Sequence, residues 1–110
     1  MNFIAREVIL QAVKAIVPLL EAIRRKDREL HEQLRSALSS ASLNLAEGAA
    51  FRDGNRDARY ATARGSAREV RDALELAVAY GYVQRDEVAE ADGLLDRFGA
   101  LTWRLTHPRR

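Results

Sequence analysis

The sequence predicts an all-α protein that folds as an antiparallel up-down-up-down four-helix bundle. Its composition is rich in the strong helix formers Ala, Leu, Glu and Arg, and its 110 residues include only 2 prolines and 6 glycines. Apolar residues recur every third or fourth position through four long segments. Short polar turns separate these segments, and short connections favour antiparallel neighbours. We therefore expect one domain, residues 1–110, with helices at about 3–25, 27–51, 56–80 and 84–106.

The first predicted helix, residues 3–25, is apolar around most of its circumference. One stripe can face the core of the bundle: Ala5, Val8, Ala12, Ile16, Leu19 and Ile23. A second stripe points to one side: Ile9, Leu10, Val13, Val17 and Leu20. A helix in a monomeric bundle needs an apolar arc only somewhat wider than about 100°, so we expect the second stripe to form an interface between copies of the chain. Pro18 removes a backbone hydrogen bond and predicts either a kink or a break at which a short helix begins.

The second predicted helix, 27–51, begins at Asp27, whose carboxylate can cap it. Its core stripe comprises Leu30, Leu34, Ala37, Leu38, Ala41, Leu45 and Gly48. A polar turn follows, in which Gly54 suits a positive φ and Asn55 can cap the next helix.

The third predicted helix, 56–80, has a core stripe of Tyr60, Ala63, Ala67, Val70, Leu74, Ala77 and Val78. On its outer face, helical spacing permits two ion pairs, Arg68–Asp72 and Arg71–Glu75. We expect Gly81 to end this helix. The fourth helix, 84–106, should begin near Gln84 and be followed by a frayed tail, His107–Arg110. Its core positions are Val88, Ala91, Leu95, Phe98, Thr102 and Leu105.

A polar seam flanks the core stripes of the second and third helices. Its most informative members are Asn44, Glu47, Arg64, Ser66 and Glu69. A buried carboxylate needs hydrogen bonds, a cation or a proton. The seam therefore predicts either hydrogen bonds that fix the register of helices or subunits, or part of a surface for a ligand or partner. A Glu47–Arg64 pair fits both an edge between the two helices and a contact between subunits.

The residues that usually carry catalysis or bind metals are absent or isolated. The chain has no cysteine, and its two histidines, His31 and His107, are far apart. Neither histidine follows a glutamate by three positions, which is the spacing that carboxylate-bridged metal sites in bundles use. We expect both histidines to be solvated, no cofactor or metal to be bound, and the protein not to be an enzyme. An enzyme that uses Glu47 and Glu69 has no motif in its favour.

The charge of the chain is nearly balanced, with 18 basic and 16 acidic residues and a net charge of +2. Its longest apolar run is much shorter than the roughly 20 residues that span a bilayer, so we expect a cytoplasmic protein without a membrane segment. Arginines are concentrated around the third helix, interleaved with carboxylates. They form either a solvated, salt-bridged face or, when repeated in an assembly, a surface for nucleic acid. The candidate nucleic-acid contacts are Arg52, Arg56, Arg59, Arg64 and Arg68.

Two short phrases, SLNLAEG at 42–48 and ARGSARE at 63–69, resemble the signatures S-N-I-A-E-G and A-R-G-S-x-x-E. These are signatures of the small four-helix-bundle proteins encoded in 23S rRNA intervening sequences. The first phrase departs from its signature at Leu43 and at Leu45, which stands in place of Ile. The resemblance extends from about Leu30 to Leu105. A branch of the family is the accessory variability determinant of diversity-generating retroelements.

The resemblance implies a homopentamer that acts as a binding or scaffolding module. Its partners would be other copies of the chain and, by similarity to the retroelement accessory protein, RNA or DNA and a reverse transcriptase. The alternative is a structural or protein–protein interaction module with no role in binding nucleic acid.

Overall fold

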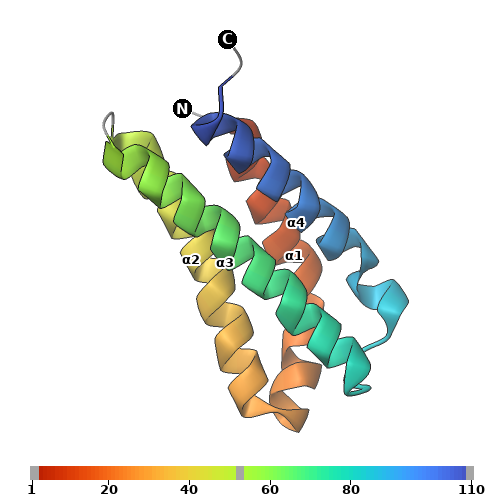
Figure 1. Cartoon of the computed structure of the whole chain (residues 1–110). Helices are drawn as coiled ribbons and strands as arrows, with labels where there is room; N and C mark the ends of the chain where they lie inside the picture. Colours follow the sequence, from red (N-terminus) through yellow and green to blue (C-terminus); the bar gives the residue numbers. More distant parts are fainter. Residues whose placement is uncertain (1–2, 52–53, 109–110) are drawn as a thin grey trace.

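The computed structural model describes residues 3–51 and 54–108. They form four helices: α1 (Phe3–Lys26), α2 (Arg28–Ala50), α3 (Gly54–Ala79) and α4 (Arg85–Thr106). Successive helices run in opposite directions, and the start of α1 and the end of α4 lie at the same end of an elongated bundle measuring 45 × 22 × 19 Å (Figure 1). The predicted all-α, antiparallel four-helix bundle is confirmed.

The two turns at the other end of the bundle are tied together through Asp27. Its Oδ1 accepts a hydrogen bond from the Leu30 backbone N–H at 2.9 Å, so the predicted cap of α2 is confirmed. Its Oδ2 accepts a hydrogen bond from the hydroxyl of Tyr82 at 3.0 Å, in the loop between α3 and α4. Partial burial raises the pKa of Tyr82, and the hydrogen bond to Asp27 raises it further.

The ends of α3 and α4 follow local sequence signals, with one exception. Gly81 has a φ of 79°, which permits the chain to leave α3 where the sequence predicts. α4 begins beside Gln84, as predicted, and the Glu87 carboxylate accepts a hydrogen bond from the Gln84 backbone N–H at 2.8 Å. Gly54 does not have the expected positive φ; it is the first residue of α3. Asn55 therefore lies inside the first turn of α3 and not at its cap.

Of the two alternatives at Pro18, the break is not found, because α1 continues through this residue. Proline has no N–H to donate to the carbonyl four positions earlier, that of Lys14. Both residues are exposed, so water can satisfy this carbonyl.

The core contains nearly all of the predicted stripe residues and two residues that were expected elsewhere. Ile9 has no exposed surface, because it lies seven residues from Ile16 on the same face of α1. It therefore cannot belong to an exposed interface stripe. His31 is only 7% exposed, on the flank of α2 that also carries Leu38. The expectation of a solvated His31 is wrong, and its Nδ1 has no hydrogen-bond partner among the described residues.

Candidate functional site

The apolar flank of α1 is less exposed than the sequence predicts. Val13 and Leu20 are partly buried and pack against the core of the protomer. Leu10 is also partly buried, and Val17 is 54% exposed. The part of this flank that is free to contact another molecule is therefore centred on Val17 and Leu10.

A cavity of about 280 Å³ extends this flank between the start of α1 and the end of α2. Leu10 contributes one wall, and Leu43, which is 63% exposed, contributes the other. The remaining lining is mostly apolar: Leu45, Ala46, Ala49 and Tyr60, with Arg6 and Ser42. We call Leu10, Val17 and Leu43 the α1–α2 apolar face.

Hydrogen bonds join part of the predicted polar seam between α2 and α3. The hydroxyls of Ser40 and Ser66 lie 2.7 Å apart, and Ser66 is buried. Asn44 donates through Nδ2 to the backbone oxygen of Ser40 at 2.9 Å and to its hydroxyl at 3.1 Å. These contacts match the first interpretation of the seam, in which hydrogen bonds between helices fix their register.

The other seam residues lie apart from this network or join it through a different arginine. Glu47 pairs with Arg59 at 3.1 Å, and Arg59 also donates to the Asn44 side-chain oxygen at 3.3 Å. Within the protomer this pair replaces the expected Glu47–Arg64 contact. Glu69 is exposed and lines a groove between α2 and α3, whereas Arg64 lies on the side of α3 that faces α4.

The candidate nucleic-acid arginines do not form one face. Arg52 lies outside the described residues. Arg56 lies 5.1 Å from the centre of the buried Tyr60 ring, and Arg59 pairs across to α2. Arg64 and Arg68 point instead into a groove between α3 and α4. The expected surface is therefore divided between two sides of α3.

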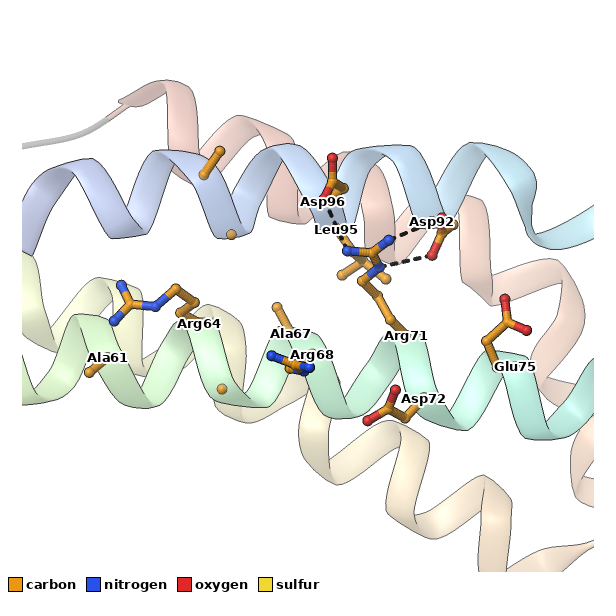
Figure 2. Close-up of a pocket in the computed structure, with 13 residues that line it drawn as sticks. Ala61, Arg64, Ala67, Arg68, Arg71, Asp72, Glu75, Asp92, Leu95 and Asp96 are labelled. Atoms are coloured by element: carbon orange, nitrogen blue, oxygen red, sulfur yellow. Dashed lines mark hydrogen bonds and ion pairs between the residues drawn. The ribbon is translucent and has the colours of Figure 1, made fainter.

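The α3–α4 groove, shown in Figure 2, has a volume of about 810 Å³, and its lining includes the small residues Ala61, Gly65, Gly99 and Ala100. Arg71 reaches across it from α3. Its guanidinium donates to Asp92 at 2.9 and 3.3 Å and to Asp96 at 3.0 Å. Hydrogen bonding to Asp92 raises the pKa of Arg71. These contacts replace the predicted Arg71–Glu75 pair.

Glu75 pairs with Arg85 at the start of α4, at 2.9 and 3.1 Å. The hydrogen bonds from Arg85 hold the pKa of Glu75 below its ordinary value. One half of the groove therefore carries Arg71 among carboxylates, of which Asp92, Asp96 and Glu75 are paired with arginines.

The other half of the groove is basic. Arg64 donates to the Thr106 hydroxyl at 3.4 Å, which is a neutral partner. Arg68 is exposed and makes no hydrogen bond or ion pair with any residue in 3–51 or 54–108, so the predicted Arg68–Asp72 pair is not found there. The guanidinium groups of Arg64 and Arg68 thus face this half, and neither is paired with a carboxylate of the described residues.

An aromatic pair at the end of α4 was not predicted from the sequence. The rings of Trp103 and His107 are stacked, with centroids 4.0 Å apart and an interplanar angle of 6°. His107 Nδ1 lies 2.9 Å from the Trp103 backbone oxygen, which can only accept, so this nitrogen donates. The expectation that His107 belongs to a frayed tail is therefore wrong. The signal was present as a tryptophan and a histidine four positions apart on one helix.

No group of three or more His, Cys, Asp or Glu side chains in the described part of the chain is arranged to hold a metal ion. Among the same residues, no helix combines the length and apolarity needed to cross a membrane.

Comparison with known proteins places this geometry in a family. Residues 3–103 match the model of the 23S rRNA-intervening sequence protein family. The structure is similar to a crystal structure of a protein of unknown function from Bacteroides thetaiotaomicron, assigned to the S23 ribosomal protein family, with a TM-score of 0.82. The two share 19% sequence identity, over 94% of this chain and 98% of the other, so the likeness supports the fold. A search of curated proteins gives no match.

Proposed function

We propose that this chain, which belongs to the 23S rRNA-intervening sequence protein family, acts as a homo-oligomeric scaffold without enzymatic activity. The observation that supports assembly is the α1–α2 apolar face, where Val17 and Leu43 are each more than half exposed. A ring of five copies is the assembly that the resemblance to the retroelement accessory protein implies.

Burying this face would stabilise an assembly. Full burial of a Val or Leu side chain contributes roughly 1.5–3 kcal/mol, and part of that gain offsets the entropy lost when the copies associate. The cavity between α1 and α2 offers a recess into which an apolar side chain of a second copy could fit. A ring repeats such a contact at every subunit boundary.

Light scattering after size exclusion tests this assembly. The wild type should have several times the 12.3 kDa mass of one chain. A Val17→Glu/Leu43→Glu variant should have a lower mass and retain the helical circular dichroism of the wild type, because both side chains are exposed in the protomer. Val13 is unsuitable for this test because it packs against the core.

Leu76→Glu is the matched control for this variant. Leu76 is 45% exposed on α3, away from the α1–α2 apolar face, so its substitution should leave the mass unchanged. A monomeric wild type at micromolar concentration would contradict the proposal. So would a Val17→Glu/Leu43→Glu variant with the mass of the wild type.

A second candidate function, binding of RNA or DNA alongside a reverse transcriptase, is favoured by the basic half of the α3–α4 groove. Arg64 and Arg68 face this half without a carboxylate partner among the described residues. Because the net charge of one chain is only +2, we expect useful affinity only when several copies act together. Phosphate contacts release counterions, so affinity should fall steeply with salt.

Titration of mixed-sequence RNA and DNA at two salt concentrations tests this candidate. Arg64→Glu/Arg68→Glu should abolish most binding, whereas Arg56→Glu/Arg59→Glu should weaken it less, because those arginines contact Tyr60 and Glu47. A wild type that fails to bind at low salt would contradict a nucleic-acid role. The alternative would then be a scaffold whose partners are proteins.

A further inference from the structure

We propose that the basic half of the α3–α4 groove, together with Trp103 and His107, binds one nucleotide unit, an aromatic base with its phosphate. The site goes beyond the phosphate contacts proposed above, because it recognises the base as well. Such a unit can be a free nucleotide or part of a single-stranded nucleic acid, and both present the same chemistry.

The register of α3 and α4 places Trp103 beside this half of the groove. Arg71 crosses to Asp92 and Asp96, and Arg64 crosses to Thr106, so the two helices run antiparallel with Arg64 opposite the last turn of α4. Gly99 lines the groove, and Trp103 follows it by four residues on the same face. Trp103 and His107 do not line the groove itself; they follow its last lining residues on α4, Gly99 and Ala100.

The aromatic pair has the properties of a stacking platform. His107 covers part of Trp103, yet Trp103 remains 50% exposed. His107 is held parallel to the indole by its hydrogen bond to the Trp103 backbone oxygen and by a 2.9 Å contact with the Thr106 hydroxyl. A ring fixed in this way loses little further freedom when a base stacks on the pair.

The guanidinium groups of Arg64 and Arg68 recognise the phosphate of the nucleotide. Arg64 is positioned by Thr106, whose hydroxyl also donates to the Trp103 backbone oxygen at 3.0 Å. The phosphate-binding arginine and the aromatic platform therefore belong to one hydrogen-bonded unit. Arg68 lies one turn further along α3 and is free to move toward an anion, since it has no partner in 3–51 or 54–108.

Two glycines that line the groove, Gly65 on α3 and Gly99 on α4, leave room for a flat ligand to approach the backbone. A Cβ added at Gly65 or Gly99 would meet no atom within 4 Å, so neither glycine is required by packing inside the protomer. A glycine inside a helix weakens the helix relative to alanine. A ligand that approaches the backbone closely at this face would account for glycine at these two positions.

The charges favour a nucleotide over a helix from another protein. A helix laid on this half of the groove would bury Arg64 and Arg68 away from water, and an uncompensated buried charge is strongly unfavourable. A phosphate neutralises them directly, and guanidinium groups match its geometry. Asp92 and Asp96 in the other half repel a second phosphate, so we expect the site to hold one.

Trp103 is the only tryptophan in the chain, so its fluorescence reports this site directly. The full-length protein is titrated with AMP, with inorganic phosphate, with a six-nucleotide single-stranded DNA and with an abasic strand of the same length. Saturable quenching by AMP, by the DNA strand or by both is expected, and the pattern identifies the source of the nucleotide. Phosphate and the abasic strand should quench little, since neither has a base.

Fluorescence anisotropy of a labelled strand measures binding in variants whose tryptophan is replaced. Trp103→Ala should weaken binding roughly 5- to 100-fold, and Trp103→Phe should restore most of it, because phenylalanine also stacks. Arg68→Gln should weaken binding about 10-fold. Its matched control, Arg97→Gln, removes another exposed charge, from α4 outside the groove, and should have little effect.

Absence of quenching by both AMP and the DNA strand would overturn the site. If the labelled strand nevertheless binds, the nucleic-acid role stands and only the location is wrong. Quenching by AMP without binding of the strand would support the site and contradict the nucleic-acid role. Equal quenching by the abasic strand would overturn recognition of the base.

Discussion

The two contacts that α3 makes with its neighbours use small residues in opposite ways. Against α2, a Cβ added at Gly48 would lie 2.7 Å from the ring of Tyr60, so only glycine fits. Against α4, a Cβ added at Gly65 would meet nothing within 4 Å. Each glycine lies in one of the two short sequence phrases at 42–48 and 63–69. Packing inside the protomer explains the first glycine and does not explain the second.

Gly48→Ala should produce the largest effect, because it breaks the close contact. The new methyl group must displace the buried Tyr60 ring, over which Arg56 also lies. Overpacking of this kind destabilises a protein by about 1–3 kcal/mol, which exceeds the roughly 0.5–1 kcal/mol that alanine adds to helix stability. Urea unfolding of the wild type and of Gly48→Ala shows whether the substitution lowers the free energy of unfolding. An unchanged or higher free energy of unfolding would show that α2 and α3 are not held as closely as described.

The sequence predicts features that depend on neighbouring residues along the chain. The cap at Asp27, the end of α3 near Gly81 and the core stripes were predicted correctly for this reason. Features that depend on the rotation of each helix and on the register between helices were not predicted. Both the Arg71–Asp92 bridge and the burial of His31 belong to this class.

The candidate site was also only partly predicted, because it depends on the rotation of the helices. Five arginines were recognised as candidates, but helical spacing alone does not say which of them face α4. The structure assigns Arg64 and Arg68 to the α3–α4 groove and Arg59 to α2. The Trp103–His107 pair could have been predicted from its four-residue spacing, and was missed because His107 was assigned to a frayed tail.

Ser66→Val should have the next largest effect on the α2–α3 contact. It removes the buried hydroxyl that lies 2.7 Å from Ser40 and adds volume in a tight seam. Loss of the hydrogen bond alone costs about 0.5–1.5 kcal/mol. Ser66→Ala, which adds no volume, separates the two contributions, and both variants can be compared by thermal unfolding. Wild-type stability in both variants would mean that the hydroxyl pair does not hold the register.

Gly65→Ala should stabilise the protomer by about 0.5–1 kcal/mol, because alanine favours helix and the new Cβ meets no atom. The same substitution should weaken binding of AMP measured by Trp103 fluorescence, since it adds a methyl group to the lining of the α3–α4 groove. Urea unfolding and the AMP titration on one variant sharpen the contrast with Gly48. A destabilised Gly65→Ala protomer would show that both glycines serve internal packing.

The smallest expected effect is a pH dependence that belongs to the α3–α4 side alone. Arg85 lowers the pKa of Glu75 in the folded protein, so this pair stabilises the fold above the ordinary pKa of a glutamate and is lost as the pH falls through the lowered value. The stability difference between the wild type and Glu75→Gln should therefore favour the wild type at neutral pH and vanish well below about pH 4. Urea unfolding at both pH values measures it. A difference that persists in acid would contradict this cause.

Native mass spectrometry of the wild type tests the central claim, assembly from identical copies, most directly, because it counts the chains in each particle. We predict a single dominant species of five chains, each of 12.3 kDa. A closed ring of another size would support the homo-oligomeric scaffold and contradict the prediction of five chains. A spectrum that contains only single chains, at concentrations where the protein is folded, would contradict the account.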